Sequence, residues 1–137
     1  MAFWISFSCY FLVGVGSLAF GIIYMTRSEF MPYHAKAIGK EWKETEPNIR
    51  FLILMLMRVA GSGMVGAGIM SFILLYIPFR NHETWAIFTL PFLGLIMVLT
   101  TLYVTSKVKR NTPASPPVGF NAGCLCLILV GFVLSLI

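Results

Sequence analysis

The chain has 137 residues, of which 58% are hydrophobic and only 11% are charged. Soluble domains are roughly half apolar and a quarter charged, and five acids with ten bases are too few to coat so apolar a chain in water. The composition therefore excludes an ordinary soluble protein and indicates that lipid is the main solvent. The net charge of +5 does not point to nucleic acid, because in a membrane protein the placement of the bases matters more than their sum.

Four apolar stretches, residues 3–25, 50–78, 85–106 and 118–137, predict transmembrane helices. Each reaches the roughly 20 residues that a helix needs to cross the hydrocarbon core. We therefore expect residues 1–137 to form a single transmembrane domain, an all-α four-helix bundle. The first stretch is interpreted as a retained helix, because it lacks the basic start of a signal peptide and its apolar core is too long.

Small residues recur at spacings of three and four along the first span and again in the second. Rows of this kind let two helix backbones approach closely, so we expect the first two helices to pack together. The residues assigned to this packing are Gly14, Ser17, Gly21, Ser62, Gly63, Gly66 and Ala67. The same rows leave open a cleft for a lipid, a quinone or a pigment between the two helices.

The loop after the first span begins with a segment rich in ionisable side chains, RSEFMPYH. It supplies a base, an acid, a phenol and an imidazole, and such a set can do acid-base chemistry. Arg27, Glu29, Tyr33 and His34 are therefore candidate ligand-binding residues. No nucleophile pairs with His34, however, and the simpler interpretation is a solvated loop that binds lipid headgroups.

Further along this loop, Ala35, Ile38 and Trp42 recur at helical spacing. The pattern predicts an amphipathic helix at the membrane surface, although Gly39 interrupts it. Thr45 is placed to cap the second span.

Arg58 lies about seven residues inside the second span, which places its charge roughly 10 Å into hydrocarbon. A charge at this depth is costly and usually faces the protein interior. On a helical wheel Arg58 shares a stripe with Ser62 and lies close to Gly61, so we expect it to face the bundle. Three interpretations stay open, namely a site for an anionic ligand, a structural ion pair with Glu29 or Glu46, and an arginine that extends its side chain to the membrane interface.

Basic residues are concentrated in two of the three loops. The first loop holds Arg27, Lys36, Lys40, Lys43 and Arg50, the third holds Lys107, Lys109 and Arg110, and the second holds only Arg80. The positive-inside rule then places the first and third loops in the cytoplasm and both termini on the outer side of the membrane.

We expect no metal, no cofactor and no catalytic residue. Cys9, Cys124 and Cys126 lie in apolar stretches, where thiols behave as small hydrophobes. The Cys-x-Cys pair on a helix points its thiolates roughly 200° apart, too divergent for one chelate. No carboxylate pair lies inside a span, so an enzyme is the less favoured class.

The string RSEFMPYH, followed by the lone arginine and glycine-rich run of LMRVAGSGMVGAGIM, resembles small bacterial four-helix integral membrane proteins of uncharacterised function. The resemblance covers most of the chain and implies a bacterial cytoplasmic membrane, but no activity. The likeness to DoxX-like four-helix bundles is one of topology alone.

These observations favour a protein that acts by association, as an accessory subunit of a larger membrane complex or as a lipid- or quinone-binding module. A small transporter or an oligomeric channel-like protein is the second hypothesis, and a membrane enzyme acting on a lipid-like substrate is the third. The expected partners are membrane lipid and other membrane subunits or further copies of this chain. We place any ligand site where Arg58 meets residues 27–34.

Overall fold

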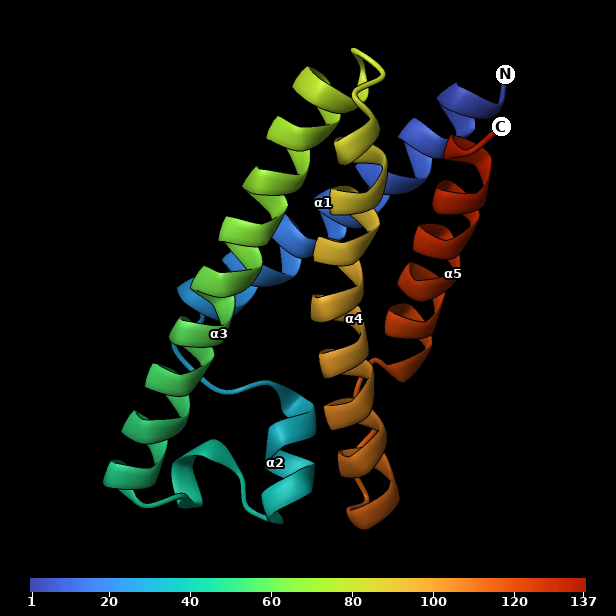
Figure 1. The fold of residues 1–137 in the computed structure, drawn as a ribbon. Coiled ribbons are helices and arrows are strands. Elements are labelled where there is room, and N and C mark those ends of the chain that lie inside the picture. Colours follow the sequence, from blue (N-terminus) through green and yellow to red (C-terminus); the bar gives the residue numbers. More distant parts are fainter.

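The computed structural model describes all residues from Met1 to Ile137 and contains helices and loops only (Figure 1). Four long helices are apolar enough to cross a membrane: α1 (Ala2–Thr26), α3 (Pro47–Leu74) with the π-helical turn η2 (Leu75–Phe79), α4 (Thr84–Asn111) and α5 (Val118–Ser135). The predicted all-α architecture with four membrane-spanning helices is therefore confirmed. Each predicted stretch lies on one of these helices.

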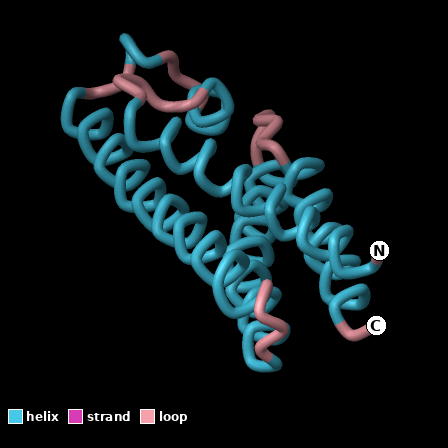
Figure 2. The backbone as a smooth tube through the Cα atoms, turned by 90° about the horizontal axis from the view of Figure 1, so that it is seen from above, coloured by secondary structure: helices cyan, strands magenta, loops and turns pink.

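The long helices alternate in direction, so that both chain ends lie at the same end of the bundle (Figure 1). We call this the terminal end. The opposite end, called the α2 end, carries the short helix α2 (Pro32–Ile38) and the connection from α4 to α5. Figure 2 shows that the irregular segments gather at these two ends. The helix α1 packs most extensively on α3 and next on α5, while α4 packs mainly on α5.

Two glycines make the closest approach between α1 and α3. A Cβ atom added to Gly21 would lie 2.8 Å from the carbonyl oxygen of Gly61, and one added to Gly61 would lie 2.8 Å from the carbonyl oxygen of Gly21. Only glycine fits at either position. Further along, Ser17 Oγ donates a hydrogen bond of 2.8 Å to the carbonyl oxygen of Met64, which ties the two helices together inside the bilayer.

The structure confirms the small residues expected to pack on the α1 side of the contact, but different residues pack on the α3 side. On α1, Gly14, Ser17 and Gly21 all lie against α3. On α3, the contact is made by Gly61, Val65 and Gly68, which share one helix face through spacings of four and three.

The residues expected on the α3 side of this contact lie elsewhere. Ser62, Gly63 and Gly66 are exposed, and a Cβ atom added to either glycine would meet no atom within 4 Å. Ala67 is half-buried and faces a cavity described below. Small residues surround most of this part of α3, so their spacing alone does not identify the face that packs.

An apolar core and one interhelical hydrogen bond close the terminal end. Phe79 and Ile128 are almost fully buried there. The hydroxyl of Ser6 on α1 donates a hydrogen bond of 2.7 Å to the carbonyl oxygen of Gly131 on α5. The wider turn of η2 accommodates Pro78, which has no N–H to donate to a regular helix.

The loop at the α2 end forms two short helical turns instead of one amphipathic helix. The helix α2 stops at Gly39, whose φ of +68° is the left-handed conformation that glycine adopts freely. Trp42 then starts the 3-10 turn η1 (Trp42–Glu44). Ala35 is buried and Trp42 packs on the same apolar cluster, but Ile38 between them is exposed, so the expected continuous stripe is wrong at Ile38.

Thr45 does not cap the second span as expected. Its hydroxyl donates to the carbonyl oxygen of Glu41, and Glu46 occupies the cap position of α3 without a side-chain hydrogen bond. The helix starts instead at Pro47, whose fixed φ suits a first turn.

The close glycine contact predicts a strong difference between two substitutions on α3. Gly61→Leu forces the side chain into the backbone of Gly21 and should lower the free energy of unfolding by about 1 to 3 kcal/mol or more. Gly66→Leu, a matched control facing open space, should change it by less than about 1 kcal/mol. Denaturant unfolding of both variants in detergent micelles measures this, and equal losses would contradict the assignment of the contact.

Candidate functional site

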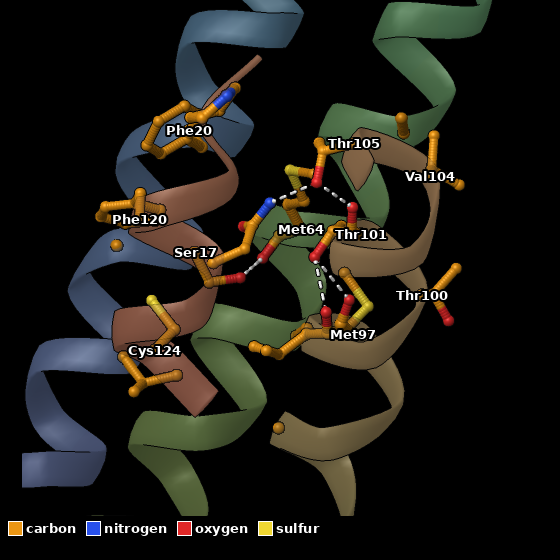
Figure 3. Close-up of a pocket in the computed structure, with 18 of the residues that line it drawn as sticks. Ser17, Phe20, Met64, Met97, Thr100, Thr101, Val104, Thr105, Phe120 and Cys124 are labelled. Carbon is orange, nitrogen blue, oxygen red and sulfur yellow. Dashed lines mark hydrogen bonds between the residues drawn. The ribbon is translucent and has the colours of Figure 1, made fainter. Parts of the chain in front are cut away.

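A cavity of about 270 Å³ lies among all four long helices (Figure 3). Most of its lining is apolar, and no Asp, Glu, Lys, Arg or His side chain is part of it. Phe20 on α1 and Phe120 on α5 contact each other on one side, with ring centroids 4.8 Å apart, while Met97 on α4 lies opposite them. Small residues that do not join the α1–α3 contact, Ala60 and Ala67 among them, leave this space open.

Hydroxyl and amide groups from α4 and α5 form a short chain of hydrogen bonds along the cavity (Figure 3). Asn121 Nδ2 donates to Thr105 Oγ1 at 3.3 Å, and Thr105 Oγ1 donates to the carbonyl oxygen of Thr101 at 2.7 Å. Thr101 Oγ1 donates in turn to the carbonyl oxygen of Met97 at 2.9 Å. The two threonine protons are thus used within α4. The Asn121 amide keeps its second N–H and its oxygen free of partners in the chain.

Two tyrosines line the cavity at the α2 end. Tyr24 comes from the last turns of α1 and Tyr33 from the first turn of α2, and their hydroxyls hydrogen-bond to each other. One phenol donates in this pair, so the accepting phenol keeps its own proton for another acceptor. Burial, reinforced by the hydrogen bond with Tyr24, raises the pKa of Tyr33 above its ordinary value of 10.0. The Tyr33 phenol therefore stays protonated at physiological pH.

His34 lies behind this tyrosine pair and does not line the cavity. Its ring centroid is 4.5 Å from that of Tyr33 and 6.2 Å from that of Tyr24, in edge-on contacts. The Nδ1 atom is buried and has no hydrogen-bond partner. Burial also lowers the pKa of His34 from its ordinary value of 6.5, because it disfavours the charged imidazolium. The imidazole is therefore neutral near pH 7.

The structure brings some of the predicted site residues together and separates others. Tyr33 and His34 share a cluster with Tyr24, as described above. Arg27 turns back on its own loop, where its Nε donates to the carbonyl oxygen of Glu29 at 3.3 Å. The Glu29 side chain is exposed, and neither residue lines the cavity.

The expectation that Arg58 faces the bundle is wrong. Arg58 is exposed on the outer side of α3, and Phe51 on the same stripe is 66% exposed. The buried face of this helix passes through Met57 and Gly61 instead. Successive residues on a helix are about 100° apart, so a buried Met57 turns Arg58 toward the surroundings. The arginine therefore does not meet residues 27–34 to form the expected site.

Sequence reasoning missed the groups that give the cavity its polar end. Asn121, in the first turn of α5, carries the only side-chain amide within the four predicted spans, and this feature alone could have marked it. Tyr24 lies on the same face of α1 as the small residues, but nothing in the sequence shows that Tyr33 reaches it from α2. Within the chain, no group of three or more His, Cys, Asp and Glu side chains could hold a metal ion.

Comparison with known proteins was made at three levels. No protein-family model matches the chain, and no curated protein or solved structure matches it either. The resemblance to bacterial four-helix membrane proteins therefore stays a prediction. What can be concluded about the site comes from its own geometry, an uncharged cavity between membrane helices that carries phenol and amide groups at its α2 end.

Proposed function

We propose that this protein is a small membrane module that binds a lipid- or quinone-type molecule in the cavity between α1, α3, α4 and α5. The observation that supports this proposal is the cavity. Ligand pockets have volumes of roughly 300 to 1,000 Å³ and combine apolar walls with a few polar groups. A volume of about 270 Å³ is just below this range and suits one ring or part of a single chain.

The free energy of packing favours a cavity that is filled by a ligand over an empty one. Protein interiors are packed to the density of organic crystals and contain few voids larger than one water molecule. An enclosed void of this volume would cost several kcal/mol at roughly 24 cal/mol per Å³. This cavity is partly open to its surroundings, so molecules of the lipid phase can enter it. An apolar molecule that fills it restores the missing dispersion contacts, and the surrounding lipid phase supplies such molecules at high concentration.

The lining favours binding over the alternative functions. A transported ion would need polar or charged partners along its path, and the cavity lining supplies none with a charge. An acid-base enzyme would need a titrating group near its substrate, whereas His34 lies behind the tyrosine pair. Binding of a lipid- or quinone-type molecule needs only an apolar cavity with a few hydrogen-bonding groups, and the lining supplies both.

The proposal includes an orientation in a cytoplasmic membrane. The α2 end carries the basic residues of the first and third loops, including Lys40, Lys43, Lys107 and Arg110. The loop at the terminal end, between η2 and α4, carries only one basic residue, Arg80. The positive-inside rule favours an arrangement in which the α2 end faces the cytoplasm and both termini lie outside.

Filling the cavity from α3 should abolish ligand binding. In Ala67→Phe the added ring occupies the space of the ligand, and the amount of lipid or quinone that copurifies should fall about tenfold or more. The matched control Val59→Phe places the same ring on the outer face of α3, where Val59 is 71% exposed. Mass spectrometry of organic extracts measures the copurified molecules. An unchanged yield from a folded Ala67→Phe protein would contradict the proposal.

Single cysteines test the orientation. In a background without Cys9, Cys124 and Cys126, a membrane-impermeant maleimide added to intact cells should label Asn81→Cys and leave Lys40→Cys unlabelled until the membrane is opened. The opposite pattern would show that the α2 end faces outward.

A further inference from the structure

The cavity admits no ionised group without a large penalty. None of its lining residues carries a charge, and the nearest titratable imidazole, that of His34, is neutral near pH 7. Burying an unpaired carboxylate or phosphate away from water costs many kcal/mol. The part of a ligand that enters this cavity is therefore uncharged, which excludes fatty-acid carboxylates and ionised phospholipid headgroups from the interior.

The α2 end of the cavity offers hydrogen-bond donors that the fold itself leaves unused. The hydroxyl protons of Ser17, Thr101 and Thr105 are all given to backbone carbonyl oxygens. The unused donors at this end are one phenol of the Tyr24–Tyr33 pair and the second N–H of Asn121. The hydroxyl of Ser71, on α3, is a further lining donor that lies away from this end. The raised pKa keeps the Tyr33 phenol protonated. Because one of the two phenols donates within the pair, the other O–H can donate to an acceptor atom of a ligand.

The shape of the lining suits a flat group. The rings of Phe20 and Phe120 lie on one side of the cavity, and the thioethers of Met64 and Met97 project into it from α3 and α4 (Figure 3). Aromatic rings and polarizable sulfur atoms pack well on planar conjugated systems. A single ring also agrees with a volume of about 270 Å³.

We infer that the cavity selects an uncharged carbonyl compound with a flat ring, the chemistry of membrane quinones, whose oxygen accepts a hydrogen bond from the Tyr24–Tyr33 pair or from Asn121. This inference rests on the proposed function, because it names the chemical class of the ligand in the same cavity. It distinguishes a ring with acceptor oxygens from a ring without them on a chain of equal length, and both from an ionised lipid.

Three matched probes test the inference on purified protein in phosphatidylcholine nanodiscs. They are a benzoquinone with a ten-carbon alkyl chain, decylbenzene and decanoate, each measured by equilibrium binding against empty nanodiscs. The quinone should bind about tenfold or more tightly than decylbenzene, since two acceptor oxygens can use the free donors. Decanoate should bind most weakly of the three.

Variants then assign the preference to named groups. The double variant Tyr24→Phe/Tyr33→Phe, which removes both phenols, and the single variant Asn121→Leu should each weaken quinone binding by about 3- to 10-fold, the effect of one lost hydrogen bond, and leave decylbenzene binding unchanged. Either variant alone suffices if the other fails to fold. Tyr103→Phe is the matched control, because Tyr103 is 65% exposed on α4 and lies outside the cavity lining.

The outcomes separate this inference from the proposed function. Equal binding of the quinone and decylbenzene, with no effect of the double variant Tyr24→Phe/Tyr33→Phe or of Asn121→Leu, would overturn the carbonyl preference while leaving an apolar ligand site. Tight binding of decanoate would overturn the requirement for an uncharged group. Absence of specific binding by all three probes, together with unchanged copurified lipid in Ala67→Phe, would overturn the proposed function as well.

Discussion

The backbone contact between Gly21 on α1 and Gly61 on α3 constrains the rest of this bundle. Because each glycine lies where a Cβ atom would come within 2.8 Å of the other's carbonyl oxygen, the two helices are held at a distance that no larger residue permits. The helix α5 joins the terminal part of α1 through the hydrogen bond from Ser6 to Gly131. The helix α4 reaches α1 mainly through α5, and the cavity occupies the space that this arrangement leaves between them.

The short helix α2 gives this cavity its chemical asymmetry. It brings the Tyr33 phenol from outside the spans onto the Tyr24 phenol at the end of α1, and the residues Phe30 and Ala35 anchor it on Met57 of α3. The phenol and amide donors therefore lie at the α2 end of a mostly apolar space, to which Ser71 on α3 adds one further hydroxyl. A ligand whose oxygen meets the phenols or Asn121 would direct its apolar part toward the terminal end.

The sequence predicts the spans well and the faces of the helices poorly. Length and hydropathy are sufficient for the spans, because the bilayer sets a fixed length for each helix. The small residues of α1 lie in one row, so Gly14 and Gly21 are placed correctly. In α3, small residues occur on several faces. The residue that packs on α1 is Gly61 and not Gly63 or Gly66, and this choice depends on the shape of the partner helix. Arg58 is a second example of a helix face that the sequence does not predict. It directly follows the buried Met57, and a step of one residue along the helix is enough to turn a side chain from the buried face to the exposed one.

The central claim is that the fold maintains an open, uncharged cavity with phenol and amide donors at one end, and that a ligand fills it. A crystal structure of the protein purified with its native lipids tests this claim most directly. The account predicts one ordered non-protein molecule among the four helices, with an oxygen atom within hydrogen-bond distance of the Tyr24–Tyr33 pair or Asn121. Helices closed upon one another, with no space between Phe120 and Met97, would contradict it.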